Sequence, residues 1–91
     1  MKINKSDFAT ARQYARVTSG EVIRILREKK EWTQDELARR SGISATNLSM
    51  LENNRVDIGK KRAEQLAQAF GVHPAIIMFP EYEAEQIQRA A

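Results

Sequence analysis

Two short helical segments joined by a tight turn are the feature that most constrains the fold of this chain. Thr33 and Glu36 have the Thr-x-x-Glu spacing of a capping box, which predicts a helix from residue 33 to Arg40. Ser41-Gly42 follows, and glycine accepts the positive φ that ends a helix. Ser44 is placed to cap a second helix that runs to about Asn53. The sequence therefore predicts two short helices separated by three residues.

The rest of the chain also has helical patterns and almost no strand signal. Thr18 and Glu21 repeat the capping-box spacing before a helix over 19–30. Asp57 or Gly59 begins another helix through Phe70, and Pro74 starts a short helix after Gly71. Weaker patterns cover 6–16 and 80–91. No segment alternates apolar and polar residues over a strand length, so we expect an all-α fold.

The helix pair over 33–53 has an apolar inside and an uncharged outside. The residues with the spacing that such a pair needs in its interior are Leu37, Ala38, Gly42, Ile43, Leu48 and Leu51. The outer face of the second helix carries Ala45, Thr46, Asn47, Ser49 and Met50, without a Lys or a Glu. A face of short, uncharged side chains suits a DNA groove, where base edges must come within hydrogen-bonding reach.

Composition and charge narrow the functional classes. The 91 residues correspond to one domain, and the absence of cysteine excludes disulfides and thiolate metal sites. Residues 1–62 hold 14 Lys or Arg and 8 Asp or Glu, a balance of +6, whereas 63–91 hold 1 and 4, a balance of −3. A basic half suits a polyanion, although a solvated charged surface explains it equally well. No secretion signal or membrane helix is apparent, so we expect a cytoplasmic protein.

Residues 33–55, TQDELARRSGISATNLSMLENNR, resemble the helix-turn-helix of the Cro/phage-repressor family, also called the XRE family. The resemblance covers about residues 20–79 and includes Leu66-Ala67 and Gly71-Val72. It implies a compact five-helix repressor-like bundle that pairs as a homodimer on a two-fold, double-stranded DNA site. Extra helical segments are expected at either end.

The resemblance also implies roles for individual residues. Ala45, Thr46, Ser49 and Met50 match positions that face base edges, and Asn47 matches one that reaches a base or the backbone. The positions that match phosphate contacts are Thr33, Gln34, Asn53, Arg55, Lys60 and Lys61. Arg27 and Glu52 match a bridged, mainly structural ion pair.

The chain departs from the family pattern at two turns. Glu31 and Asn54 stand where members often have glycine. Asparagine tolerates the left-handed backbone better than other side chains, so we expect Asn54 to fit. Glutamate adopts that backbone conformation less readily, so the sequence does not predict the backbone path from Lys30 to Trp32.

A cluster of large apolar residues near the C-terminus predicts an interface. Ile76, Ile77, Met78, Phe79 and Tyr82 are too many for one short segment to bury against its own bundle. Exposed apolar patches often mark interfaces, so we expect these residues to form the dimer contact.

The pattern divides the chain into an N-terminal extension (1–18), a DNA-binding domain (19–79) and an acidic tail (80–91). We expect a sequence-specific transcriptional regulator, most often a repressor. The alternative is an antitoxin that binds a toxin protein through 1–18 and 81–91 and represses its own promoter. An enzyme is not expected: without a nucleophile or a Gly-rich phosphate loop, Glu81, Glu83 and Glu85 are better explained as a solvated acidic tail than as catalytic carboxylates. His73 lacks metal-binding partners, and no metal or cofactor is predicted.

Overall fold

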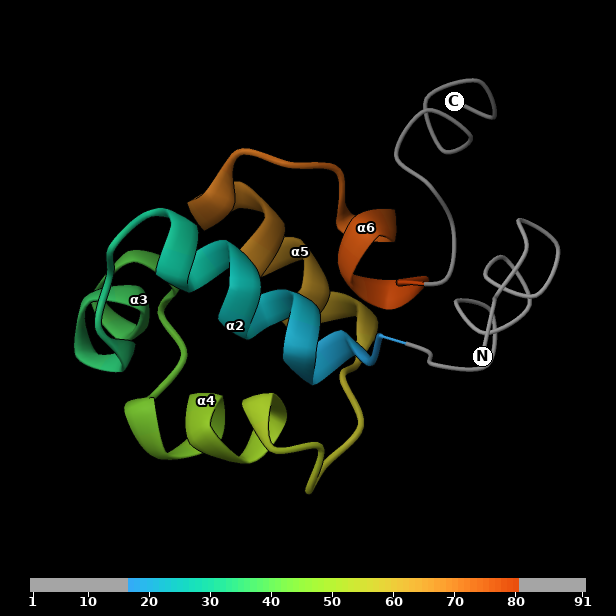
Figure 1. Cartoon of the computed structure of the whole chain (residues 1–91), viewed down its shortest axis with the longest axis horizontal. Helices are drawn as coiled ribbons and strands as arrows, with labels where there is room; N and C mark the ends of the chain where they lie inside the picture. Colours follow the sequence, from blue (N-terminus) through green and yellow to red (C-terminus); the bar gives the residue numbers. More distant parts are fainter. Residues whose placement is uncertain (1–16, 81–91) are drawn as a thin grey trace, which may run out of the picture.

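The structure, a computed structural model, describes residues 17–80, which form five helices and contain no strand (Figure 1). The helices are α2 (Ser19–Lys29), α3 (Gln34–Ser41), α4 (Ala45–Glu52), α5 (Lys60–Phe70) and α6 (Pro74–Met78). The prediction of an all-α fold is thus confirmed for the described residues. The helix predicted over 6–16, and all but Pro80 of the one predicted over 80–91, lie outside them.

Side-chain caps set where the first three helices begin. The hydroxyl oxygens of Thr18, Thr33 and Ser44 accept hydrogen bonds from the backbone N–H three residues on, at 3.1, 3.0 and 3.2 Å. Each cap satisfies an N–H group that has no partner inside its helix. At the other ends, Gly42 and Gly71 take φ values of 79° and 73°, and their N–H groups donate to the carbonyls of Ala38 and Ala67. Side-chain caps therefore set where α2, α3 and α4 begin, and left-handed glycines set where α3 and α5 end.

Two turns place a non-glycine residue in the left-handed region. Glu31 and Asn54 both have φ of 58°. The Glu31 N–H donates to the Glu28 carbonyl at 2.9 Å, and the Trp32 N–H donates to the Arg27 carbonyl at 3.1 Å. The chain thus makes the turn between α2 and α3 with a glutamate at the positive-φ position, which costs backbone strain that glycine would avoid.

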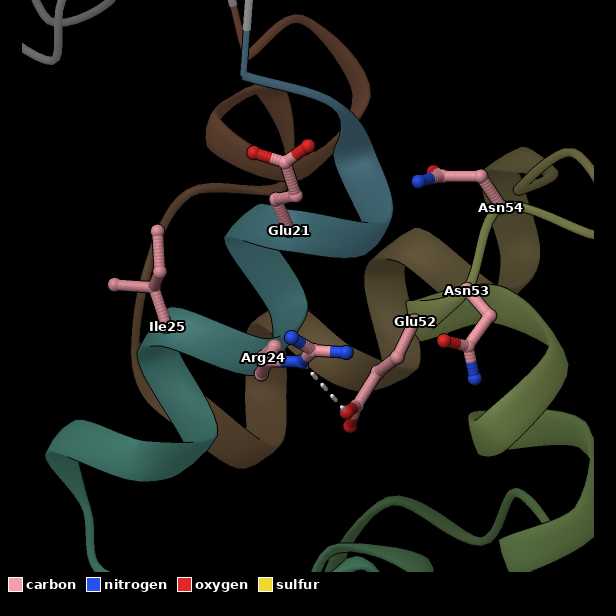
Figure 2. A pocket seen from close by; sticks show the side chains of 6 residues that line it. All are labelled: Glu21, Arg24, Ile25, Glu52, Asn53 and Asn54. Atoms are coloured by element: carbon pink, nitrogen blue, oxygen red, sulfur yellow. Dashed lines mark ion pairs between the residues drawn. The ribbon is translucent and has the colours of Figure 1, made fainter.

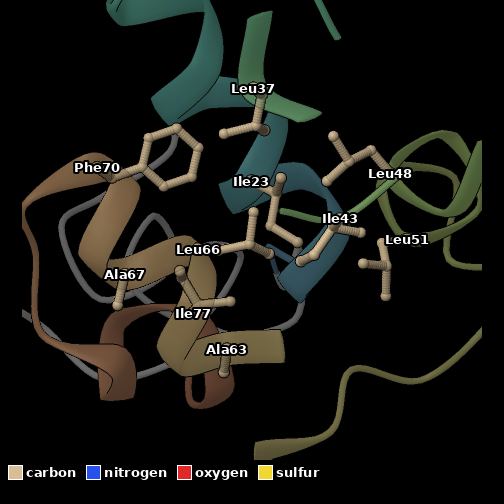
Figure 3. Packing of buried hydrophobic residues seen from close by; sticks show 10 residues of the cluster. All are labelled: Ile23, Leu37, Ile43, Leu48, Leu51, Ala63, Leu66, Ala67, Phe70 and Ile77. Carbon is tan, nitrogen blue, oxygen red and sulfur yellow. The ribbon is translucent and has the colours of Figure 1, made fainter. Parts of the chain in front are cut away.

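The core lies where all five helices meet (Figure 3). Ile23 of α2, Leu37 of α3 and Leu66 of α5 are fully buried at its centre. The other members of the core are Ile43, Leu48, Leu51, Ala63, Ala67, Phe70 and Ile77. α4 packs its apolar side against α2 and α3, and it lies at an edge of the molecule in Figure 1. The opposite side of α4 is therefore left on the surface.

The last helix corrects one expectation about the apolar cluster. α6 packs against α5 and α2, and the Ser19 hydroxyl donates to the Ile77 carbonyl at 2.7 Å. The Ile77 side chain is fully buried, so it belongs to the core of its own chain and not to an exposed patch. Ile76 and Met78 are half-buried, and Phe79 is 47% exposed. Tyr82 lies outside the described residues.

Candidate nucleic-acid interface

The outward side of α4 is uncharged and borders a shallow depression. Leu48 and Leu51 face the core, which leaves the first turn of the helix and its opposite side to solvent. The depression, of about 440 Å³, is lined by Ala45, Thr46, Ser49, Met50, Asn53 and Arg55. Asn47 is half-buried, and its N–H is held by the Ser44 cap. Four of the five predicted base-reading residues therefore share one surface with two of the predicted phosphate contacts.

The chain turns sharply after α4 and brings a cation to the rim of that depression. The Asn53 side-chain amide donates to the Ser49 carbonyl at 2.8 Å, which fixes its orientation. The Arg55 N–H donates to the Met50 carbonyl at 2.9 Å, and the Arg55 side chain is exposed. A neutral surface therefore ends at a guanidinium, a group that forks onto phosphate oxygens or onto guanine.

The start of α5 carries positive charge at a helix end that disfavours it. Lys60, Lys61 and Arg62 occupy its first turn, with no acidic residue among them. Gly59 precedes them and offers no side-chain cap. The N-terminus of a helix has a partial positive charge, so cations there lower the stability of the helix. A bound anion would offset both the charge of the helix end and that of the cations. Lys60 and Lys61 are both exposed and able to meet such an anion.

The two predicted phosphate contacts at the start of α3, Thr33 and Gln34, differ in the hydrogen bonds that they already make within the protein. The Thr33 oxygen accepts from the Glu36 N–H, so its own O–H remains a donor for an outside acceptor. The Gln34 side-chain amide donates to the Glu52 Oε1 atom at 3.3 Å. Gln34 therefore links the start of α3 to the end of α4.

A buried ion pair joins α2 to α4. The Arg27 Nε and Nη2 atoms donate to the two Glu52 carboxylate oxygens at 2.8 and 3.1 Å, and Nη1 donates to the Trp32 carbonyl at 2.8 Å. The Glu52 side chain is 1% exposed. These hydrogen bonds with Glu52 raise the pKa of the Arg27 guanidinium above its ordinary value, despite partial burial. The structure thus brings together the two residues that the family resemblance implied as a pair.

A second arginine of α2, which sequence reasoning missed, faces the same carboxylate. The Arg24 Nε atom lies 4.0 Å from the Glu52 Oε1 atom (Figure 2). Arg24 and Arg27 are three residues apart and so share one face of α2, which is the one signal of Arg24 that the sequence contains. Around Arg24 is a second depression, lined also by Glu21, Ile25, Glu52, Asn53 and Asn54.

Gly20 explains how α2 approaches the end of α4 so closely. A β-carbon on Gly20 would overlap the Leu51 carbonyl oxygen and lie 2.8 Å from that of Glu52. The Gly20 N–H donates to the Asn54 side-chain oxygen at 3.3 Å. Gly20 therefore allows the start of α2 to pack closely against the end of α4, a role that the sequence did not reveal.

Residues 17–80 contain neither a cluster of metal-binding side chains nor a membrane-spanning helix. His73 caps α6, its Nδ1 atom accepting from the Ala75 N–H at 3.0 Å. Within the described ranges, no three His, Asp or Glu side chains gather as a metal site would require. None of the helices α2 to α6 combines the length and apolarity needed to cross a membrane.

Comparisons with known proteins place this geometry among regulators. The family model described as helix-turn-helix matches residues 23–77. The solved structure of a hypothetical transcription factor from Neisseria is similar, with 27% sequence identity and a TM-score of 0.64. The alignment covers 80% of each chain.

Curated relatives carry related names. A hypothetical transcription factor of Neisseria meningitidis is 36% identical over 67% of this chain and 58% of its own length. A competence pilus inhibition repressor of Acinetobacter baylyi is 41% identical over 56% of this chain and 46% of its own. A helix-turn-helix-type transcriptional repressor of Bacillus subtilis is 32% identical over 78% and 53%. The chain thus spans about half the length of the curated relatives it matches.

Proposed function

The chain belongs to the helix-turn-helix family of the Cro/phage-repressor (XRE) type, and from this premise we propose that it is a sequence-specific DNA-binding transcriptional regulator. Family membership indicates such a regulator rather than an enzyme. The finer proposal is a repressor that binds a palindromic operator as a homodimer in the cytoplasm. The names of two relatives as repressors support that direction.

The observation that carries the proposal is the uncharged outward side of α4. Its only acidic residue, Glu52, is buried against α2, so no carboxylate on this helix would meet phosphate or base edges. In this proposal α4 enters the major groove with Ala45, Thr46, Ser49 and Met50 toward the bases, and Asn47 beside them. None of these five is an arginine or a lysine, the residues that read guanine. Asn47 is the one side chain among them of the type that pairs with adenine. Thymine methyls and groove shape are therefore the main features read.

Contacts to the DNA backbone hold α4 in register. We assign these contacts to two residues that precede α4 in the sequence, Thr33 and Gln34, and to four that follow it, Asn53, Arg55, Lys60 and Lys61. Such contacts supply affinity that is independent of sequence and falls with salt, because each releases condensed counterions.

The test is selection from a library of random duplexes, followed by gel-shift titration at physiological salt. We expect one enriched sequence with two-fold symmetry, bound far more tightly than a scrambled duplex. Equal affinity for the selected and the scrambled duplex would contradict the proposal.

Single substitutions separate the two kinds of contact. Thr46→Ala removes an exposed side chain from the depression and should alter preference at one or two base pairs, each worth about 1–3 kcal/mol. Lys61→Gln should weaken binding by the same factor on every sequence. Gel shifts against a panel of single-base-pair variants of the selected duplex measure both effects. A uniform loss for Thr46→Ala would remove Thr46 from the base-reading set.

The antitoxin alternative remains a prediction. It assigns partner binding to 1–18 and 81–91, and residues 1–16 and 81–91 lie outside the described part of the chain. Co-expression with the product of the adjacent gene, followed by co-purification, tests it. Separate elution of the two proteins would count against it.

A further inference from the structure

The Arg24 guanidinium is the starting point, because the contacts around it leave most of its donors unused. Its side chain is 50% exposed, and its distance of 4.0 Å to the Glu52 carboxylate is too long for a hydrogen bond. Both Glu52 oxygens already accept from Arg27 at 2.8 and 3.1 Å. Among residues 17–80, no hydrogen bond of the Arg24 side chain to another residue is found. Two guanidiniums thus face one carboxylate, and the surplus positive charge lies on the more exposed of them.

The neighbouring acid does not remove that surplus. Glu21 lines the same depression as Arg24, one turn earlier on α2. In Figure 2 its carboxylate points away from the Arg24 guanidinium. Glu21 lies in the first turn of α2, where a negative charge offsets the partial positive charge of the helix end.

The depression around Arg24 adjoins the surface assigned to DNA. Asn53 lines both this depression and the one along the outward side of α4. Gln34, at the start of α3, reaches the same Glu52 carboxylate that Arg24 faces. Arg24 therefore lies near one predicted phosphate contact on each side of α4, Gln34 before it and Asn53 after it.

We propose that Arg24 is a further phosphate contact, by which α2 grips the DNA backbone beside Asn53. This inference rests on the proposed function and extends it to a helix to which neither the sequence nor the comparisons give a DNA-binding role. A guanidinium that is held near its position by a buried carboxylate, yet keeps free N–H groups, is well prepared to fork onto phosphate oxygens. Arg24 would add affinity without sequence preference.

The experiment compares the wild-type chain with Arg24→Gln and Arg24→Lys by fluorescence anisotropy on two labelled duplexes. One duplex carries the sequence selected by the wild-type chain, and the other has a scrambled sequence. Titrations at several salt concentrations give the slope of log affinity against log salt. Arg24→Gln should reduce that slope by about 0.9, the value expected for one lost phosphate contact. The advantage of the wild type over this variant should then shrink by about threefold between about 50 and 200 mM salt.

Two matched variants make the result specific. Arg24→Lys keeps the charge and should keep the wild-type slope. Lys29→Gln removes one charge from the same helix, at an exposed position about 140° around the axis from Arg24. Its slope should equal that of the wild type.

Thermal unfolding of the same variants separates a phosphate contact from a purely structural role. A lower Tm for Arg24→Gln with an unchanged salt slope would mean that Arg24 only neutralises Glu52, and would overturn the inference. A loss confined to the selected duplex would overturn it too, because it would indicate base reading. If the wild type binds neither duplex, the proposed function fails, and this inference fails with it; binding by the wild type with an unchanged Arg24→Gln slope sinks this inference alone.

Discussion

At the scale of single residues, Glu52 holds three helices in fixed relation. Its buried carboxylate accepts hydrogen bonds from Arg27 of α2 and Gln34 of α3, while its own backbone belongs to α4. A buried carboxylate is tolerated only when charged or hydrogen-bonding partners replace the lost water. The angle at which α4 projects therefore depends on partners that come from two other helices.

The energetics of this pair are tested by removing one partner and then both. Arg27→Met leaves Glu52 buried without its main partner and should lower the free energy of unfolding by about 3–5 kcal/mol. The double variant Arg27→Met/Glu52→Leu should recover most of that loss, because apolar replacements avoid the cost of desolvating charge. Urea unfolding followed by circular dichroism measures both. Arg39→Met, at a side chain that is 75% exposed, should change stability by less than about 1 kcal/mol. A double variant as unstable as the single one would show that the charges themselves stabilise the fold.

At the scale of elements, the turn between α2 and α3 stores strain at Glu31. Its φ of 58° is unfavourable for an L-residue with a β-carbon, by about 1–2 kcal/mol. Glu31→Gly should therefore raise the free energy of unfolding by about 0.5–1 kcal/mol, after the greater entropy that glycine gives the unfolded chain is subtracted.

The matched comparison for this prediction is Asn54→Gly. Asn54 has the same φ, but asparagine tolerates it, and its side-chain oxygen accepts from the Gly20 N–H. This change should give no gain in stability. Thermal unfolding of the two variants beside the wild type decides the matter, and a larger gain at Asn54 than at Glu31 would refute the strain argument.

The start of α5 gives a prediction in which stability and binding move in opposite directions. Lys61→Glu places a negative charge in the first turn and should stabilise the helix end by about 0.3–1 kcal/mol. The same change should weaken binding to every duplex, because it brings a carboxylate to a position assigned to phosphate. Urea unfolding and anisotropy titration on one preparation measure both. A variant that gains stability and binds DNA as well as the wild type would remove Lys61 from the interface.

The elements were predictable where their signals are local. Thr18, Thr33 and Ser44 each cap a helix through a contact three residues away, and Gly42 ends α3 through its own backbone angle. The predicted bounds differ by about one residue, as with 33–40 against Gln34–Ser41. The uncharged side of α4 followed from the same short-range periodicity.

What escaped prediction depends on contacts between distant parts of the sequence. Gly20 meets Asn54 across 34 residues, and Ser19 meets Ile77 across 58. The cluster of Ile76, Ile77, Met78, Phe79 and Tyr82 was predicted to form a dimer contact, yet packing of α6 onto α2 and α5 buries Ile77. The convergence of Arg24 on Glu52 likewise requires α2 and α4 to be packed together first. Helical periodicity gives the face on which a residue lies, but not which other helix will cover that face.

At the scale of the whole molecule, the start of α2 and the end of α6 lie together on one side. The hydrogen bond from the Ser19 hydroxyl to the Ile77 carbonyl joins them. Val17 and Phe79, which flank this contact in the sequence, are 40% and 47% exposed, although both are large and apolar. In Figure 1 this region is on the opposite side of the molecule from the turn between α3 and α4. A homodimer formed there would leave the start of α4 in each protomer open to DNA.

The dimer proposal is tested by changing Phe79 and comparing it with an equally exposed apolar residue elsewhere. Phe79→Asp should shift sedimentation from dimer to monomer and should abolish tight binding to a two-fold operator, since paired half-sites require two protomers about 34–36 Å apart. Binding of that variant to an isolated half-site should match that of the wild type.

Ile25→Asp is the control, because Ile25 is also 47% exposed but lies on α2 beside Arg24. It should remain dimeric. A wild-type chain that sediments as a monomer well above micromolar concentration, or a Phe79→Asp variant that stays dimeric, would place the contact between protomers elsewhere or remove it.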